Sequence, residues 1–249
     1  MDYLTEKGLR ESTIETKRKI LSMLSKRFNL WDSEAIRDYL KTSTLSGKRK
    51  NNVNYAYQGW CKSKGFDYTF TYFEEKDQSL PYIPKETEID QLIAGFNNRY
   101  ACYLQLLKET GFIPNEALSL TPNDLDLERR IVTLNKPAKR SNPRQFRLSN
   151  KLVIMLGKLI PSNKSNEKIW KLPYQSMSRT YCYQRKVLSE KMANPNLKRI
   201  SFKTFRHWKA TMEYHRTKDI LYVKELLGHK SIKNTLIYTP LVDFEDQNF

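Results

Sequence analysis

Apolar side chains recur at helical spacing through the first 65 residues of the chain. Ile14, Leu21 and Leu24 fall on one face of a predicted helix. Ser12, followed three positions later by Glu15, matches the capping box that starts many helices. The pattern therefore predicts a helix that begins near Ser12.

Two more helices are expected to begin at polar capping residues. Asp32 or Ser33 precedes the second apolar set, and Ser46 precedes the third. The third helix opens with the basic run Lys48-Arg49-Lys50. Such a bundle is either a solvated structural domain or a clamp whose basic ends face phosphates, and periodicity alone does not separate the two.

A polar segment interrupts the helical pattern at residues 77–85, where two prolines oppose helix formation. We therefore expect a domain at residues 1–76, a linker at 77–85 and a second domain at 86–249. Helices are predicted again at about 87–96 and 99–110. A third follows the break at Thr110-Gly111 and begins at Pro114, which favours the first helical position.

Two short segments with strand character lie inside the second domain. Residues 131–134 (IVTL) are apolar and mostly β-branched, and residues 145–148 (QFRL) alternate polar and apolar side chains. A basic, proline-containing turn joins them. The predicted fold class is mainly α with a small antiparallel β-hairpin sheet, arranged as two domains.

The net charge of the chain predicts a polyanionic partner, which the helical pattern alone does not indicate. Lys and Arg number 44 against 27 Asp and Glu, a net charge of +17. Residues 129–151 hold eight basic side chains and no acidic one, and residues 179–218 hold eleven against two. Solvated faces normally mix signs, so two one-signed stretches predict a groove for duplex DNA. A basic RNA-binding role remains an alternative, although nothing in the sequence resembles an RNA-binding module.

Three cysteines lie far apart with no CxxC pair, which argues against a zinc site and a disulfide scaffold. The sequence shows no run of about 18 apolar residues and no signal-peptide pattern at its start. We therefore expect no membrane contact, no metal and a cytoplasmic, nucleoid-associated protein.

Three sequence segments carry recognisable chemistry. Residues 110–126 read TGFIPNEALSLTPNDLD, residues 203–211 read KTFRHWKAT, and residues 226–231 read LLGHKS. His229 follows Arg206 by 23 positions, and Tyr238 follows His229 by 9. Together the segments resemble the motifs of the tyrosine recombinases, the family of phage integrases and Xer-type resolvases: T-G-x-R-x-x-E-x-L-x-L, H-x-L-R-H-x-x-A-T, and L-G-H followed by Tyr.

The resemblance covers about residues 87–240 and implies site-specific DNA recombination or integration, as in mobile elements, without a cofactor. Tyr238 would attack a DNA phosphodiester and form a covalent 3′-phosphotyrosine. Arg206 and His229 would stabilise the charged transition state. Lys136, in the hairpin turn, would protonate the leaving 5′-oxygen, with Lys139 as the alternative.

Two positions depart from the family pattern. Lys203 stands where most members have histidine, and a lysine there acts as base or phosphate contact only if nearby cations lower its pKa. Ile113 replaces the first catalytic arginine, and isoleucine cannot contact phosphate oxygens. The chain is then either a substituted, weakened enzyme or a natural degenerate relative. We favour the first interpretation because the five other site positions hold plausible residues.

Further expectations follow from the resemblance. The partner is double-stranded DNA, the assembly a homotetramer on paired sites, and the N-terminal helices a core-binding clamp. His207, Glu116 and Asp124 are expected to support the site structurally. Two alternatives stay open: a non-catalytic DNA-binding protein, favoured by Ile113, and a type IB topoisomerase-like enzyme. The expected DNA contacts are basic side chains from the two domains: Lys48, Arg49, Lys50, Lys139, Arg140, Arg144 and Arg147.

Overall fold

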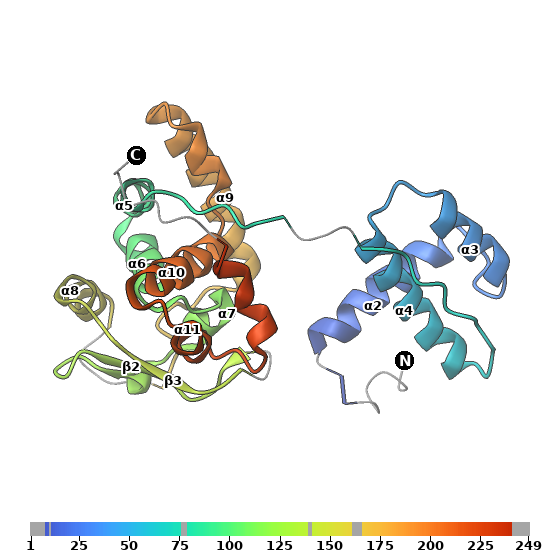
Figure 1. The fold of residues 1–249 in the computed structure, drawn as a ribbon, viewed down its shortest axis with the longest axis horizontal. Coiled ribbons are helices and arrows are strands. Elements are labelled where there is room, and N and C mark those ends of the chain that lie inside the picture. Colours follow the sequence, from blue (N-terminus) through green and yellow to red (C-terminus); the bar gives the residue numbers. More distant parts are fainter. Residues whose placement is uncertain (1–7, 10, 76–78, 139–140, 161–165, 241–249) are drawn as a thin grey trace. The chain divides into compact units, whose positions relative to one another are not determined.

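The structure is a computed structural model that describes residues 8–9, 11–75, 79–138, 141–160 and 166–240. The chain divides into two compact units, Met1–Ser79 and Leu80–Phe249 (Figure 1). The division falls between Ser79 and Leu80, inside the segment expected to be a linker.

The first unit contains three helices: α2 (Glu11–Ser25), α3 (Ser33–Thr42) and α4 (Gly47–Ser63). Asp32 caps α3 by accepting from Ala35 N at 3.0 Å, and Ser46 caps α4 by accepting from Arg49 N at 3.3 Å, which confirms both predicted helix starts. Ser12, by contrast, lies inside the first turn of α2 and not at its cap, because that helix begins at Glu11.

An extended segment after α4 closes the core of the first unit. Two buried asparagines of α4 hold its backbone. Asn51 donates to Phe73 O at 2.8 Å and accepts from Phe73 N at 2.9 Å, while Asn54 donates to Thr71 O at 2.7 Å. These amides pair backbone groups that would otherwise be buried without partners. The unit therefore owes part of its structure to polar contacts that periodicity does not reveal.

The second unit is mainly helical, and its central helix is α6. Ten of the thirteen residues of α6 are buried, and it packs against α5, α8 and α10 (Figure 1). The C-cap Gly111 adopts φ 62°, a left-handed conformation that glycine tolerates without strain. The helices of this unit are α5 (Glu86–Gly95), α6 (Asn98–Thr110), α7 (Pro114–Ser119), α8 (Asn150–Leu159), α9 (Tyr174–Lys191), α10 (Phe202–Thr217) and α11 (Ile220–Leu227), with short 3₁₀ turns η1 (Pro122–Asp124), η3 (Pro195–Arg199), η4 (Ile232–Asn234) and η5 (Leu236–Tyr238).

A three-stranded antiparallel sheet lies beside these helices in the order β1-β2-β3. The expected hairpin is present as β2 (Ile131–Leu134) and β3 (Arg144–Arg147), with Val132 opposite Phe146. A third strand, β1 (Leu125–Asp126), pairs with β2 and was not predicted. The fold class, mainly α with a small antiparallel sheet, is confirmed. No helix in the described part of the chain is long and apolar enough to cross a membrane.

Candidate active site

Five separate segments of the second unit converge on one cavity of about 560 Å³. They are the start of α7, the hairpin turn at Ser141, one face of α9, the first turns of α10 and the residues that follow α11. Three of them supply the candidate residues Ile113, Lys203, Arg206 and His229. The three motifs found in the sequence, together with α9 and the hairpin turn, thus line one space.

Arg206, which lines this cavity, is fixed by two helix ends. Its guanidinium donates to Gly111 O at 2.8 Å and to Leu227 O at 2.7 Å, the C-terminal carbonyls of α6 and α11. Burial lowers the pKa of Arg206 to about 10, with Arg144 adding to the effect, so the side chain stays charged at neutral pH. The side chain is 8% exposed. It is therefore a preorganised cation in the lining of the cavity.

His229 is placed by the left-handed turn that ends α11. Gly228 adopts φ 69°, and its carbonyl accepts from Asn142 N at 3.1 Å, which joins this turn to the hairpin. His229 Nδ1 lies 2.9 Å from Thr235 Oγ1. Burial, Arg206 and Arg144 lower the pKa of His229 to about 4, so the ring is neutral at pH 7. With the Thr235 hydroxyl as donor, the ring proton resides on Nε2 and is available for an anion.

Tyr238 lies in η5 and is only 2% exposed. Its phenolic oxygen is 3.0 Å from His207 Nδ1. Burial raises the pKa of Tyr238 to about 12, although Arg206 opposes the shift, and burial lowers the pKa of His207 to about 4. Among the described residues, those lining the cavity do not include Tyr238. His207 thus holds the phenol of Tyr238 within the electrostatic influence of Arg206, and these pKa shifts favour a protonated phenol and a neutral imidazole at pH 7.

The two candidate lysines differ in their relation to the cavity. Lys203 is exposed in the first turn of α10 and lines the cavity. Lys136 is exposed in the turn after β2 and does not belong to the lining. Lys139, the alternative to Lys136, lies outside the described residues. The hairpin turn thus reaches the cavity at Ser141, while Lys136 lies outside the lining.

Arg144, expected among the DNA contacts, is instead part of a buried ion pair. Its Nη2 lies 2.6 Å from Glu116 Oε2, with side-chain exposures of 5% and 0%. Glu116 also accepts from Ile113 N at 2.9 Å and from Ala138 N at 3.1 Å. A guanidinium engaged in this way does not present itself to a DNA backbone, so Arg144 is removed from the expected DNA contacts. Glu116 holds the start of α7, as expected.

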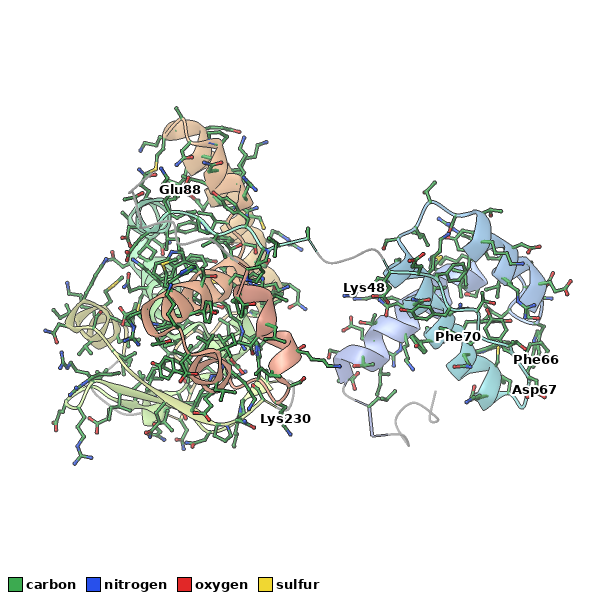
Figure 2. All side chains as sticks on the ribbon, viewed as in Figure 1. Lys48, Phe66, Asp67, Phe70, Glu88 and Lys230 are labelled. Atoms are coloured by element: carbon green, nitrogen blue, oxygen red, sulfur yellow. The ribbon has the colours of Figure 1, made fainter. Side chains whose placement is uncertain are left out.

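The other expected DNA contacts are distributed over both units. In the first unit, Lys48 is exposed at the start of α4 (Figure 2). Arg49 beside it is also exposed, whereas Lys50 donates to Lys41 O at 3.2 Å. In the second unit, Arg147 is exposed on β3. Arg140 lies outside the described residues.

Two residues of the site were missed or undervalued by sequence reasoning. His207 was expected only to support the structure, but it contacts the candidate nucleophile directly. Arg185 of α9 lines the cavity, although only its membership of a basic stretch was visible beforehand. Asp124 holds the loop after α7 by accepting from Thr121 N at 2.8 Å, as expected. Among the described residues, no group of three or more His, Cys, Asp or Glu side chains could hold a metal ion.

Comparison with known proteins agrees with this geometry. The model of the phage integrase family matches residues 84–243. Tyrosine recombinase XerA of Saccharolobus solfataricus is 32% identical over 142 residues, which span 56% of this chain and 45% of that protein. Tyrosine recombinase XerA of Pyrococcus horikoshii is 27% identical over 259 residues, covering 95% of this chain and 86% of that protein.

Solved structures share the fold at lower sequence identity. The Tn1549 transposon integrase in complex with transposon right end DNA superposes with a TM-score of 0.72 at 13% identity, covering 97% of this chain and 93% of that one. A crystal structure of XerA recombinase gives a TM-score of 0.54 at 20% identity, with coverage of 97% and 92%. The family model spans most of the second unit and includes every segment around the cavity, and the chain belongs to the phage integrase family of tyrosine recombinases.

Proposed function

We propose that this chain is a site-specific DNA recombinase that cleaves and rejoins DNA through a covalent 3′-phosphotyrosine on Tyr238. The observation that carries the proposal is the convergence of Arg206, His229 and Lys203 on one cavity, with the phenol of Tyr238 hydrogen-bonded to His207, the residue that follows Arg206. The XerA relatives, named as tyrosine recombinases, support it.

The proposed chemistry uses each residue in a separate role. The oxygen of Tyr238 attacks phosphorus, the P–O5′ bond breaks, and the phosphoryl group passes to the tyrosine. Arg206 and the Nε2–H of His229 donate to the non-bridging oxygens, whose negative charge grows in the transition state. Lys136 delivers a proton to the leaving 5′-oxygen, and Lys203 acts as base or phosphate contact. A free DNA hydroxyl then reverses the same steps and rejoins the strand.

Tyr238 has to move before it can attack. In the structure its phenol is buried and bound to His207, and its pKa of about 12 keeps it protonated. DNA binding would therefore break the His207 contact and bring the phenol to the cavity. We assign the described structure to the resting state of the chain.

We further propose that double-stranded DNA is held by both units and that four copies assemble on two paired sites. Lys48 and Arg49 of the first unit and Arg147 of the second are exposed cations suited to phosphate contact. Lys50 contributes less, since its ammonium already donates to Lys41 O. The solved Tn1549 integrase complex with transposon right end DNA supports DNA as the partner.

Non-catalytic DNA binding is the second candidate function. Ile113, which lines the cavity where the family has an arginine, is the observation that favours it. Loss of one phosphate-binding cation of this kind costs roughly 10³–10⁵ in rate, by analogy with arginine fingers. The enzymatic proposal thus predicts slow cleavage, and the binding proposal predicts none.

A covalent-trapping experiment separates the two candidates. Duplexes are selected from a random pool by their binding to the chain, and nicks are then scanned along the selected site so that cleavage cannot be reversed. The recombinase proposal predicts a denaturant-resistant adduct that Ile113→Arg makes faster and Tyr238→Phe abolishes. A chain that binds the selected DNA but yields no adduct, even after Ile113→Arg, is a DNA-binding protein.

A further inference from the structure

Ile113 leaves the proposed phosphate cavity short of one cation. The cavity is also lined by Pro114, and neither side chain can donate a hydrogen bond. Transferring a phosphoryl group builds negative charge on the non-bridging oxygens, and fixed donors in a partly dry site stabilise that charge most effectively. Any compensating group has to reach the same cavity from another part of the fold.

Arg185 of α9 lines this cavity together with Arg206 and His229. It shares its helix face with Ser178 and Tyr181, which also line the cavity, because residues three and four apart lie on one side of a helix. α9 packs against α7, the helix that Ile113 precedes (Figure 1). Arg185 therefore approaches the cavity from a wall that the family's three motifs do not supply.

The guanidinium of Arg185 is held in place by the structure. Its Nη1 donates to Ile200 O at 2.5 Å, and its Cζ lies 5.4 Å from the ring centroid of Tyr181. Tyr181 is 1% exposed and donates to the same carbonyl at 2.7 Å. Ile200 precedes Ser201, the N-cap of α10. Arg185 is thus fixed to the start of the helix that carries Lys203 and Arg206.

Among the described residues, no acidic side chain neutralises the charge of Arg185. No carboxylate of the described residues forms an ion pair with it, and its buried Nε has no hydrogen-bond partner. Arg144 differs, because Glu116 neutralises it at 2.6 Å. A buried, unpartnered guanidinium N–H in a cavity is a group that an anion would satisfy.

We propose that Arg185 supplies the second guanidinium contact to the scissile phosphate, the contact that Ile113 cannot make. This inference rests on the proposed recombinase function and deepens it by assigning a catalytic residue on α9. Arg206 binds the phosphate from α10, and Arg185 binds it from α9 with the N–H groups that the carbonyl of Ile200 leaves free. Lys203 and Lys230 also line the cavity, but both are exposed ammonium groups on flexible stems that cannot grip two oxygens as a planar fork does.

The test compares adduct formation on one selected, nicked duplex with the normal phosphate or a neutral methylphosphonate at the cleaved position. On the normal phosphate, Arg185→Ala should slow adduct formation by about 10²–10³-fold. The neutral methylphosphonate needs no second cation. On that duplex, Arg185→Ala should therefore slow adduct formation by at most about tenfold. Ile113→Arg should restore cleavage to Arg185→Ala. Lys186→Ala, an exposed lysine one position away, is the matched control and should change the rate less than about threefold.

Arg185→Gln provides a second variant in case the alanine form unfolds, because its amide can still donate to Ile200 O while lacking the charge. Equal rates for the parent and both neutral variants on the normal phosphate would overturn the inference and leave the recombinase proposal intact. An adduct that forms only after Ile113→Arg would also overturn the inference and leave the recombinase proposal intact. In that case Arg185 would not replace the arginine that is missing at position 113. Absence of any adduct from the parent and from Ile113→Arg, on DNA that both bind, would overturn the proposed function and this inference together.

Discussion

Removing the carboxylate of Glu116 is expected to destabilise the second unit more than removal of any exposed charge. Glu116 has a side-chain exposure of 0% and pairs with Arg144 at 2.6 Å. It also accepts from the backbone N–H groups of Ile113 and Ala138 at 2.9 and 3.1 Å. One side chain thus joins the start of α7 to the hairpin turn and to β3.

The magnitude follows from what Glu116→Ala leaves behind. Arg144 would stay buried with its counterion gone, and its Nε already lacks a partner. Breaking a buried ion pair from one side costs about 3–5 kcal/mol. Replacing both partners by apolar residues of similar volume, as in Glu116→Leu with Arg144→Met, should cost much less, because neither charge is then left unpaired.

Urea unfolding followed by tryptophan fluorescence measures this cost for the second unit alone. Trp31 and Trp60 are replaced by Phe, so that the emission reports Trp170 and Trp208. Glu190→Ala serves as the control, because the ion pair of Glu190 with Lys198 is exposed and is worth about 0–1 kcal/mol. If Glu116→Ala lowers the free energy of unfolding by less than about 1 kcal/mol, Glu116 and Arg144 do not form a buried ion pair that stabilises the second unit.

Three further outcomes are expected. Gly228→Ala should cost about 1–3 kcal/mol in urea unfolding, because a Cβ at φ 69° is strained and would lie 3.0 Å from Asn142 O; an unchanged midpoint would contradict the conformation. Folding lowers the pKa of His207 and His229 from the usual 6.5 to about 4, so the unfolded chain binds more protons than the folded chain between pH 6.5 and 4. The free energy of unfolding should therefore fall as the pH drops through that window. This fall should be less steep once both histidines are replaced by Gln. Lys136→Ala should slow adduct formation on normal DNA but not on a 5′-bridging phosphorothiolate, whose sulfur leaves without a proton; equal losses on both substrates would remove Lys136 from its role.

Local signals in the sequence predicted much of the fold. Asp32 and Ser46 cap helices because their short side chains accept from the backbone three residues on. Gly228 ends α11 because the turn needs a positive φ. The two-residue strand β1 was missed because Leu125 and Asp126 are too few for an alternation pattern to appear.

Contacts between distant residues were beyond sequence reasoning. Arg144 lies in a stretch that holds basic but no acidic side chains. The sequence of this stretch does not distinguish an arginine that contacts DNA from one that pairs with a carboxylate, and its partner Glu116 is 28 positions away. His207 and Tyr238 are 31 positions apart, and only the packing of η5 against α10 brings them together. The place of Arg185 in the cavity likewise depends on how α9 packs, which charge alone does not encode.

Identifying the residue that carries DNA after covalent trapping decides whether Tyr238 is the nucleophile. The parent chain and Ile113→Arg are incubated with selected nicked duplexes, digested with nuclease and protease, and mapped by mass spectrometry. We expect a nucleotide linked through its 3′-phosphate to Tyr238, and we expect this linkage to be absent after Tyr238→Phe. A linkage at another residue, or none on DNA that both proteins demonstrably bind, would contradict it.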